Sequence, residues 1–443
     1  MTSTHDVPPD APGHRGGVAG GADAAGGWRA LLGVTQIEAA ARRLQPIGVQ
    51  SPLQRNDRLS QRYGAEVFLK REDLQDVRSY KIRGAYNFVA SLPSERLRHG
   101  VVCASAGNHA QGVAWTCRAM GVRGVVFLPR RTPRQKVERI RAFGGPLVDV
   151  RFAGETFDDA AAAADAEAQR TGATVVPAFD HPATAAGQGT IAREIVDELG
   201  RSPDVAVVPI GGGGLVSGMA AYFAGIGAPT RVVGVQPAGA PAMVRSVQAG
   251  HPVTIDIADD FVDGAVVRTP GRLAVAVTAE VVDRLLVVSE GRVCTELLEL
   301  YQEDGIIAEP AGALAVTGLT ELGTTLRDQT VVCVLSGGNN DVARYAEILE
   351  RSLIDQGLKH YFIVNFPQQP GALRRFLDDC LGPTDDITLF EYIKKSSREF
   401  GPALVGVELA EASDLVPLRR RFAASGLQVE PVSPDSGIFR FLI

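Results

Sequence analysis

Ser79-Tyr80-Lys81-Ile82-Arg83-Gly84-Ala85 is the most informative stretch of this sequence, and the expected fold class follows from what surrounds it. The run Ser105-Ala106-Gly107-Asn108-His109-Ala110-Gln111-Gly112 comes shortly after it. Two further runs, Gly211-Gly212-Gly213-Gly214-Leu215 and Ser336-Gly337-Gly338-Asn339, each follow an apolar, strand-like stretch. We therefore expect four turns to meet at one edge of a sheet.

From about Thr35 to Leu353, short β-branched runs alternate with longer helical patterns. This alternation is typical of an α/β protein, in which helices cover both faces of a parallel sheet. The predicted strands are 101–104, 125–128, 174–177, 205–210, 232–235, 285–288 and 331–335. Apolar residues at helical spacing predict helices over 132–143 and 155–170.

After Gln356-Gly357 the pattern changes to strand, helix, strand, strand, helix, strand. These elements are predicted at 361–365, 372–381, 388–394, 403–409, 415–424 and 427–430. That order is the split βαβ plan of a small α+β, ferredoxin-like domain, which we expect to span 358–443 and to fold separately. Residues 1–27 are rich in Gly, Ala, Pro and Asp and are predicted to be disordered, which leaves 28–353 for the main body.

Length and composition exclude several classes of protein. With 443 residues the chain fits two or three domains, and 45% apolar residues with 22% charged residues are ordinary for a globular protein. A net charge of −6 gives no reason to expect nucleic acid or an anionic membrane, and no apolar stretch reaches the roughly 20 residues that span a bilayer. The five cysteines are odd in number and scattered, which argues against disulfides and a zinc site and favours a reducing cytoplasm. They are Cys103, Cys117, Cys294, Cys333 and Cys380.

The residues Gly211, Gly212, Gly213, Gly214 and Leu215 are expected to bind a phosphate. Glycines let backbone N–H groups approach an anion, and the start of the following helix adds a partial positive charge. The dinucleotide-binding pattern fails, because Val216 and Ser217 stand where its last glycine is required, and no P-loop lysine follows. The alternative for this run alone is a tight turn that needs little steric bulk.

Lysine amines condense with aldehydes, and pyridoxal phosphate is the cofactor that turns such a lysine into a catalyst acting on amino acids. We therefore expect Lys81 to form a Schiff base, although most lysines are solvated helix residues. Successive amides from Ser105, Ala106, Gly107, Asn108 and His109 are expected to hold a substrate carboxylate.

Three polar residues are expected near the cofactor ring. Asn108 has a side-chain amide for the phenolic oxygen, and Ser336 has a hydroxyl for the ring nitrogen. Taken alone, each is also explained as an ordinary helix or strand-end cap. The functional interpretation is favoured only because the other runs are present in the same sequence. Glu309 is expected either to cap a helix or to orient the ring and Lys81.

The four runs resemble the fold-type II pyridoxal phosphate enzymes (the tryptophan synthase β-like fold), and among them the threonine and serine dehydratases, over about Thr35 to Leu353. The asparagine loop, Ser-Ala-Gly-Asn-His-Ala-Gln-Gly, resembles the form found in the dehydratases. The resemblance implies a catalytic domain of two subdomains. In it Lys81 is the Schiff-base lysine, Asn108 and Ser336 bind the ring, and Gly211 to Leu215 bind the phosphate. The implied reaction converts L-threonine to 2-oxobutanoate and ammonia, as the first step of isoleucine biosynthesis.

From Tyr361 the tail, with Asn365-Phe366-Pro367-Gln368-Gln369-Pro370-Gly371-Ala372-Leu373, resembles a single ACT-like regulatory domain. This resemblance implies isoleucine as an allosteric inhibitor, valine as its opponent, and a homotetramer. A domain that serves only oligomer assembly is the alternative. Metal-using serine racemases and some degradative dehydratases resemble this chain but place acidic ligands after the strand that corresponds to 232–235. Here that segment reads Gln236-Pro237-Ala238-Gly239-Ala240-Pro241-Ala242 and lacks carboxylates, so no magnesium or calcium site is expected.

Two other functions are compatible with these runs. A dehydratase acting mainly on L-serine differs by one methyl group in the substrate, which shifts preference by only about 1 to 3 kcal/mol. A catalytically silent amino-acid sensor would keep the fold and the tail, but it would have no need for Lys81, Asn108 and Ser336.

Overall fold

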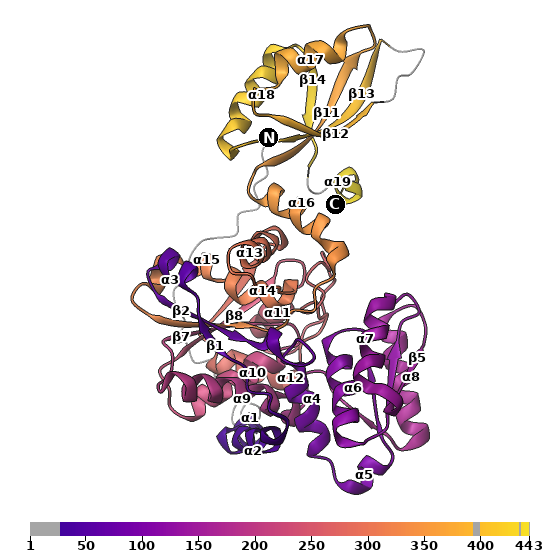
Figure 1. Ribbon diagram of the computed structural model, residues 1–443, viewed down its shortest axis with the longest axis vertical. Helices are drawn as coiled ribbons and strands as arrows, with labels where there is room; N and C mark the ends of the chain where they lie inside the picture. The colour runs from indigo at the N-terminus through magenta and orange to yellow at the C-terminus, as the bar shows by residue number, and fades with distance from the viewer. Residues whose placement is uncertain (1–26, 393–398, 434–435, 443) are drawn as a thin grey trace.

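The computed structural model describes residues 27–392, 399–433 and 436–442. These form a main body of two subdomains and a C-terminal domain that stands apart from it (Figure 1). Nearly all of the N-terminal segment 1–27, which was predicted to be disordered, lies outside the described residues, as does the end of the strand predicted at 388–394. Within those ranges, no helix combines the length and the apolar character needed to cross a bilayer.

The larger subdomain is built on a six-stranded sheet in which only the edge strand β1 is antiparallel. In spatial order its strands are β1 (Leu53–Arg55), β2 (Glu66–Arg71), β10 (Thr330–Leu335), β7 (Val205–Pro209), β8 (Arg231–Pro237) and β9 (Arg284–Val288). Because side chains alternate along a strand, Val205 and Val207 join the core on one face, whereas Ala206 and Val208 join the core on the other.

Helices cover both faces of this sheet, as the alternating pattern predicted. One face carries α1 (Gly27–Leu31), α2 (Val34–Leu44), α9 (Pro182–Leu199), α10 (Gly214–Gly225), α11 (Ala242–Ala249) and α12 (Arg272–Val281). The other face carries α3 (Asp57–Tyr63), α13 (Glu290–Gln302), α14 (Pro310–Thr317) and α15 (Leu319–Leu322).

The smaller subdomain lies between β2 and β7 in the sequence and has its own parallel sheet. Its strands, in spatial order, are β5 (Val148–Phe152), β4 (Gly124–Leu128), β3 (Val101–Ala104) and β6 (Thr174–Val175). Helices α4 (Lys81–Ala90), α5 (Ser94–Arg98), α6 (Asn108–Met120) and α7 (Arg134–Gly144) share one core, and α8 (Phe157–Thr171) packs in a second core. All seven predicted strands of the main body are present, but they divide between two sheets. The strands β1, β2 and β5 were not predicted.

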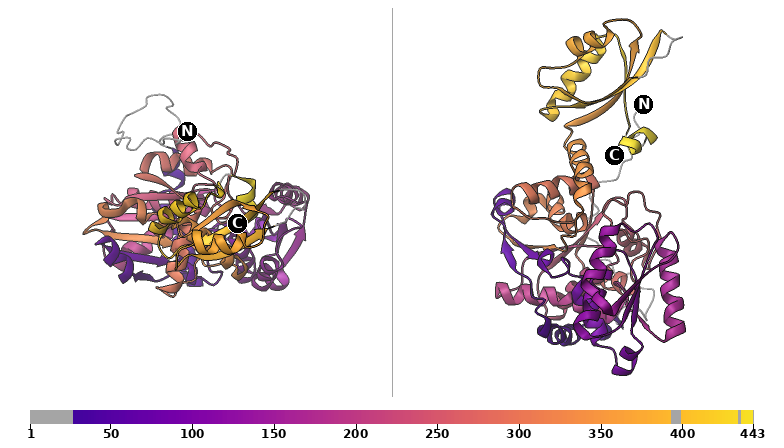
Figure 2. Two further views of the ribbon diagram at one scale, coloured as in Figure 1. Left: turned by 90° about the horizontal axis from the view of Figure 1, so that it is seen from above. Right: turned by 45° about the vertical axis from the view of Figure 1, so that its right-hand side comes forward.

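Helix α16 (Tyr345–Asp355) leads into the C-terminal domain, whose antiparallel sheet has the order β12-β13-β11-β14. The elements follow one another as β11 (Lys359–Pro367), α17 (Ala372–Cys380), β12 (Asp386–Tyr392), β13 (Phe400–Glu408), α18 (Leu415–Ala424) and β14 (Gln428–Pro431). This order confirms the predicted α+β plan. A further helix, α19 (Gly437–Leu442), comes back to lie near α16 and the main body (Figure 2).

Candidate active site

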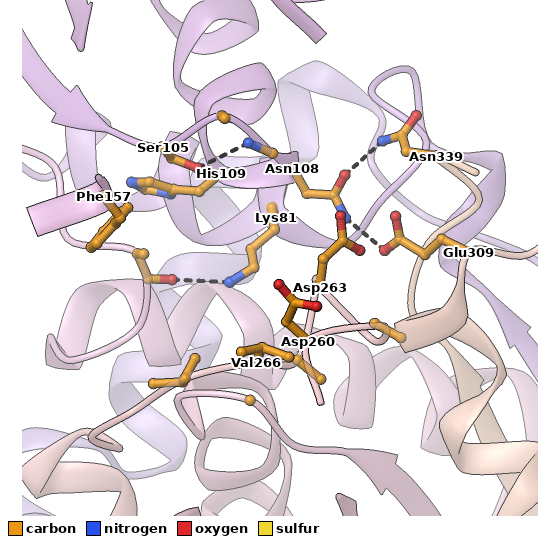
Figure 3. Close-up of a pocket in the computed structure, with 18 of the residues that line it drawn as sticks. Lys81, Ser105, Asn108, His109, Phe157, Asp260, Asp263, Val266, Glu309 and Asn339 are labelled. Atoms are coloured by element: carbon orange, nitrogen blue, oxygen red, sulfur yellow. Dashed lines mark hydrogen bonds between the residues drawn. The ribbon is translucent and has the colours of Figure 1, made fainter. Parts of the chain in front are cut away.

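A cavity of about 1340 Å³ lies between the two subdomains, and all four sequence runs contribute to its wall. Lys81 and Asn108 line it from the smaller subdomain, while Gly211, Glu309 and Ser336 line it from the larger one. Figure 3 shows Lys81 pointing into this space. The four turns therefore meet, but the prediction that they share one sheet edge was wrong. Ser105 follows β3 of the small sheet, whereas the runs at Gly211 and Ser336 follow β7 and β10 of the large sheet.

Lys81 is the first residue of α4 and lines the cavity at the start of this helix. Its Nζ donates to the carbonyl of Ala178 at 3.4 Å and lies 5.3 Å from the centre of the Tyr80 ring. The backbone N–H of Tyr80 donates to the carbonyl of Ser336 at 3.1 Å. This bond holds the lysine segment directly against the end of β10.

Residues 105–109 of the asparagine loop line the cavity, around the N-terminus of α6. The N–H of Gly107 donates to Ser105 Oγ at 3.2 Å, which closes the turn. His109 Nε2 lies 2.9 Å from the carbonyl of Val176, and burial together with the charge of Lys81 lowers the pKa of His109 to about 4. The imidazole is therefore neutral near pH 7 and donates through Nε2, since a carbonyl can only accept. It holds the loop without adding charge to the cavity.

The tetraglycine turn joins β7 to α10, and its glycines are structurally required. Gly213 has φ +93°, in the left-handed region, and a Cβ on Gly212 would lie 2.3 Å from the Phe179 ring. Gly211 lines the cavity, while Gly212, Gly213, Gly214 and Leu215 are buried around it. Among the described residues, the backbone N–H groups of 211–214 donate to no protein acceptor. Buried donors of this kind require a partner, and a phosphate at a helix N-terminus is one that fits.

Ser336 and Glu309 complete the wall on the side of the larger subdomain. Ser336 Oγ is buried and donates to the carbonyl of Ala311 at 3.2 Å. Glu309 accepts a hydrogen bond of 2.6 Å from Asn108 Nδ2 through its Oε1, as a dashed line in Figure 3 marks. Burial, helped by the charge of Asp263, raises the pKa of Glu309 to about 7.

The structure also places residues in the wall that the sequence interpretation did not select. Asn339, Arg139, Phe157, Asp260 and Asp263 all line the cavity. Asn339 belongs to a quoted run, so its position next to Ser336 could have singled it out. The other four come from α7, from the start of α8 and from the loop after α11, and no local pattern marked them.

The arrangement combines an amine, an amide, a hydroxyl and a set of unpaired backbone donors in one cavity. An aromatic aldehyde that carries a phosphate needs these groups, because the amine can bond its aldehyde carbon and the donors can hold its dianion. The residues present therefore fit pyridoxal phosphate.

Replacing Gly212 by Val is expected to weaken binding of pyridoxal phosphate by about 5- to 150-fold, since overpacking typically costs about 1 to 3 kcal/mol. The added side chain would displace either Phe179 or the turn that carries the free N–H groups. Titration of the cofactor-free protein, followed by absorbance, measures the dissociation constant.

Gly225→Val is the matched control, because Gly225 is also crowded, lies at the far end of α10 and touches Val34 rather than the cavity. This variant should lose stability but keep its affinity for the cofactor. Equal loss of affinity in both variants would mean that the turn is not the phosphate site.

Comparison with known proteins identifies two families along the chain. Residues 44–337 match the model of the pyridoxal-phosphate dependent enzymes, and residues 350–442 match the C-terminal regulatory domain of threonine dehydratase. Among solved structures, a processed form of threonine deaminase isoform 2 from Solanum lycopersicum has a TM-score of 0.67 and 34% identity, covering 72% of this chain and 94% of its own.

Curated relatives match nearly the whole chain. The biosynthetic L-threonine dehydratase of Mycobacterium tuberculosis is 56% identical over 414 residues, which is 93% of this chain and 96% of that protein. The Bacillus subtilis protein of the same name is 48% identical over 413 residues, covering 93% of this chain and 98% of that protein. The chain therefore belongs to the pyridoxal-phosphate dependent enzymes and, within them, to the biosynthetic L-threonine dehydratases.

Proposed function

We propose that this protein converts L-threonine to 2-oxobutanoate and ammonia, with pyridoxal phosphate as cofactor. The observation that carries the proposal is that Lys81 and Gly211 line one cavity, at a turn whose N–H groups at 211–214 donate to no acceptor in the part of the chain that the structure describes. When bound, the cofactor withdraws electrons from the substrate and thereby makes its α proton acidic enough to remove.

Each residue of the cavity wall has a definite role in this proposal. Gly211, Gly212, Gly213, Gly214 and Leu215 bind the phosphate through the start of α10. With the cofactor bound, Lys81 Nζ would hold it through the aldehyde carbon, Asn108 would donate to the phenolic oxygen, and Ser336 would offer a neutral hydroxyl to the ring nitrogen.

The residues that act on the substrate lie beside these groups. Backbone N–H groups of 105–109 hold its carboxylate at the start of α6. Lys81 Nζ, once released by the incoming substrate amine, accepts the α proton as general base. His109, neutral near pH 7, adds no second positive charge beside the lysine. Loss of the β hydroxyl as water leaves an enamine. The enamine tautomerises to an imine, and hydrolysis of the imine carbon–nitrogen double bond gives the oxo acid and ammonia.

The test is an assay for 2-oxo acid with threonine and with serine, using purified protein supplied with pyridoxal phosphate. We expect kcat/KM to be higher for threonine by about 5- to 150-fold, since a methyl group in an apolar pocket is worth about 1 to 3 kcal/mol. A preference for serine would make the protein a serine dehydratase. Absence of turnover with both amino acids, with no absorbance band from bound cofactor, would favour an amino-acid sensor.

The proposal extends to regulation by isoleucine as inhibitor and by valine as its opponent. The turn between β11 and α17 supports an amino-acid site, because α17 starts there and the buried Gln368 Oε1 accepts no hydrogen bond within the described part of the chain. An inhibitor acts by binding one conformation of the protein more tightly than another. We also propose that the protein is a homotetramer of the cytoplasm.

Replacing Glu309 by Gln is expected to stabilise the protein at pH 8 but not near pH 4.5. Because the folded-state pKa is raised from 4.5 to about 7, the folded protein loses stability as pH rises between these values and the buried carboxyl ionises. Gln removes that loss, so above pH 7 the unfolding free energy of the variant should exceed that of the wild type by an amount approaching about 3 kcal/mol. Thermal unfolding at several pH values measures it.

The charged groups near Glu309 include Asp263, which favours its protonated form, and Lys136 and Arg139, which favour its ionised form. Glu138→Gln on α7 serves as a control, because Glu138 is exposed and, among the described residues, forms an ion pair only with Arg134. A gain for Glu309→Gln that is the same at pH 5 and pH 8 would contradict a buried, titrating carboxyl.

A further inference from the structure

Asn339 follows Ser336 by three residues and connects the two sides of the cavity. Its Nδ2 donates to the carbonyl of Val77 at 2.8 Å and to Asn108 Oδ1 at 2.7 Å. Its Oδ1 accepts a hydrogen bond from Arg139 Nη1. Both ends of the Asn339 amide are therefore engaged, and one of its partners is the residue assigned to the phenolic oxygen of the cofactor.

The chemistry of the outer partners determines how both amides are oriented. A guanidinium can only donate and a backbone carbonyl can only accept, so Arg139 and Val77 fix which end of Asn339 is oxygen and which is nitrogen. Asn339 Nδ2 in turn requires the oxygen of Asn108 to face it. The nitrogen of Asn108 is thereby directed toward Glu309 and the cavity, as Figure 3 shows.

The loop that carries Asn339 is held on both sides by backbone contacts. The N–H of Gly338 donates to the carbonyl of Arg78 at 2.9 Å, and the N–H of Glu309 donates to the carbonyl of Gly337 at 3.0 Å. Arg78 has φ +55°, a left-handed conformation that non-glycine residues rarely adopt. Such a conformation persists where its surroundings fix it, and here it lies three residues before Lys81.

These side-chain bonds also join the two subdomains. Asn108 belongs to α6 and Arg139 to α7 of the smaller subdomain, whereas Glu309 and Asn339 belong to the larger one. The bonds Asn108–Glu309, Asn108–Asn339 and Arg139–Asn339 therefore exist together only when the two subdomains are in contact.

We propose that Asn339, held by Arg139, is a positioning residue that orients the amide of Asn108 toward the cofactor ring when the two subdomains meet. The inference rests on the proposed function, because it takes from it the role of Asn108. Asn339 acts through Asn108 rather than on the substrate.

The decisive variant is Asn339→Asp, which keeps the size of the side chain and the oxygen for Arg139 but removes the N–H donors. A carboxylate beside Asn108 Oδ1 would turn the Asn108 amide, so that its oxygen faces Glu309 and the cavity. We expect pyridoxal phosphate to bind the cofactor-free variant at least about tenfold more weakly, the loss of roughly one hydrogen bond. A shift in the absorbance maximum of the bound cofactor should accompany this loss.

Asn87→Asp is the matched control, because Asn87 has the same kind of partners away from the cavity. Its Oδ1 accepts from Arg43 Nη1 at 3.2 Å, and its Nδ2 donates to the carbonyl of Ala183 at 2.7 Å. This control should lose thermal stability while keeping the cofactor affinity and spectrum of the wild type.

Arg139 supplies a second, independent pair of variants if Asn339→Asp does not fold. Arg139→Met should reproduce the weaker binding and the shifted spectrum, and Arg139→Lys should restore both in part. Wild-type affinity and spectrum in Asn339→Asp, or in Arg139→Met, would overturn the inference, as would equal changes in Asn87→Asp. A wild-type protein that binds no cofactor would instead overturn the proposed function, so the two failures are distinguishable.

Discussion

Replacing Lys81 by Ala is expected to lower kcat/KM for threonine by at least about 10³-fold, because the lysine serves both as covalent anchor and as general base. The substitution shortens a partly exposed side chain whose Nζ makes one weak hydrogen bond, to Ala178, so the fold should persist. A coupled assay for 2-oxo acid measures the rate, and circular dichroism with thermal unfolding checks the fold.

Lys81→Arg is the companion variant, since it keeps the positive charge near Tyr80 but presents a guanidinium, which stays protonated and cannot replace the amine. Both variants should be inactive if the amine itself is required. Turnover within about tenfold of the wild type in either one would end the mechanistic assignment, because a general base alone contributes about 10² to 10⁴.

Deleting residues 358–443 is expected to abolish inhibition by isoleucine completely while some dehydratase activity remains. The C-terminal domain has its own core, in which Phe362, Phe376, Val405 and Phe422 are buried, so its removal leaves the cores of the two subdomains intact. Initial rates measured over a range of isoleucine concentrations test the prediction.

The deletion breaks contacts with α16 and also removes α19, whose Phe439 lines the cavity. Lys359 pairs with Glu350 of α16, Tyr361 donates to the same carboxylate, and the N–H of Leu358 donates to the carbonyl of Leu353 at 2.8 Å. Inhibition that persists in an active truncated protein would place the effector site in the main body. It would also remove the support drawn from Gln368.

Local sequence patterns predicted most of the secondary structure, because they reflect burial along each element. The strand at 101–104 is β3 without change, and the order of elements from β11 to β14 is as expected. β5 was missed because it is an edge strand, in which Asp149 and Arg151 interrupt the apolar residues. β2 was missed because it ends in Lys70 and Arg71, which are buried through bonds to Glu198 and Asp73 respectively.

The sequence singled out candidate site residues that each stand at a turn of their own, and the structure brings these turns together around one cavity. Lys81, Asn108, Ser336 and the glycines at 211–214 each stand at the start of a helix or the end of a strand. The contribution of Arg139 could not be predicted, because it depends on how the smaller subdomain docks on the larger one. Which sheet each turn belongs to was equally hidden, since alternation of strands and helices does not reveal that β3 to β6 form a separate sheet.

The most direct test of the central claim is to reduce the cofactor-loaded protein with borohydride, digest it and locate the cofactor by mass spectrometry. We expect the reduced cofactor on the peptide that contains Lys81, at the side-chain nitrogen, and no such label after Lys81→Ala. An unlabelled Lys81 with the cofactor on another lysine, or on none, would contradict the account.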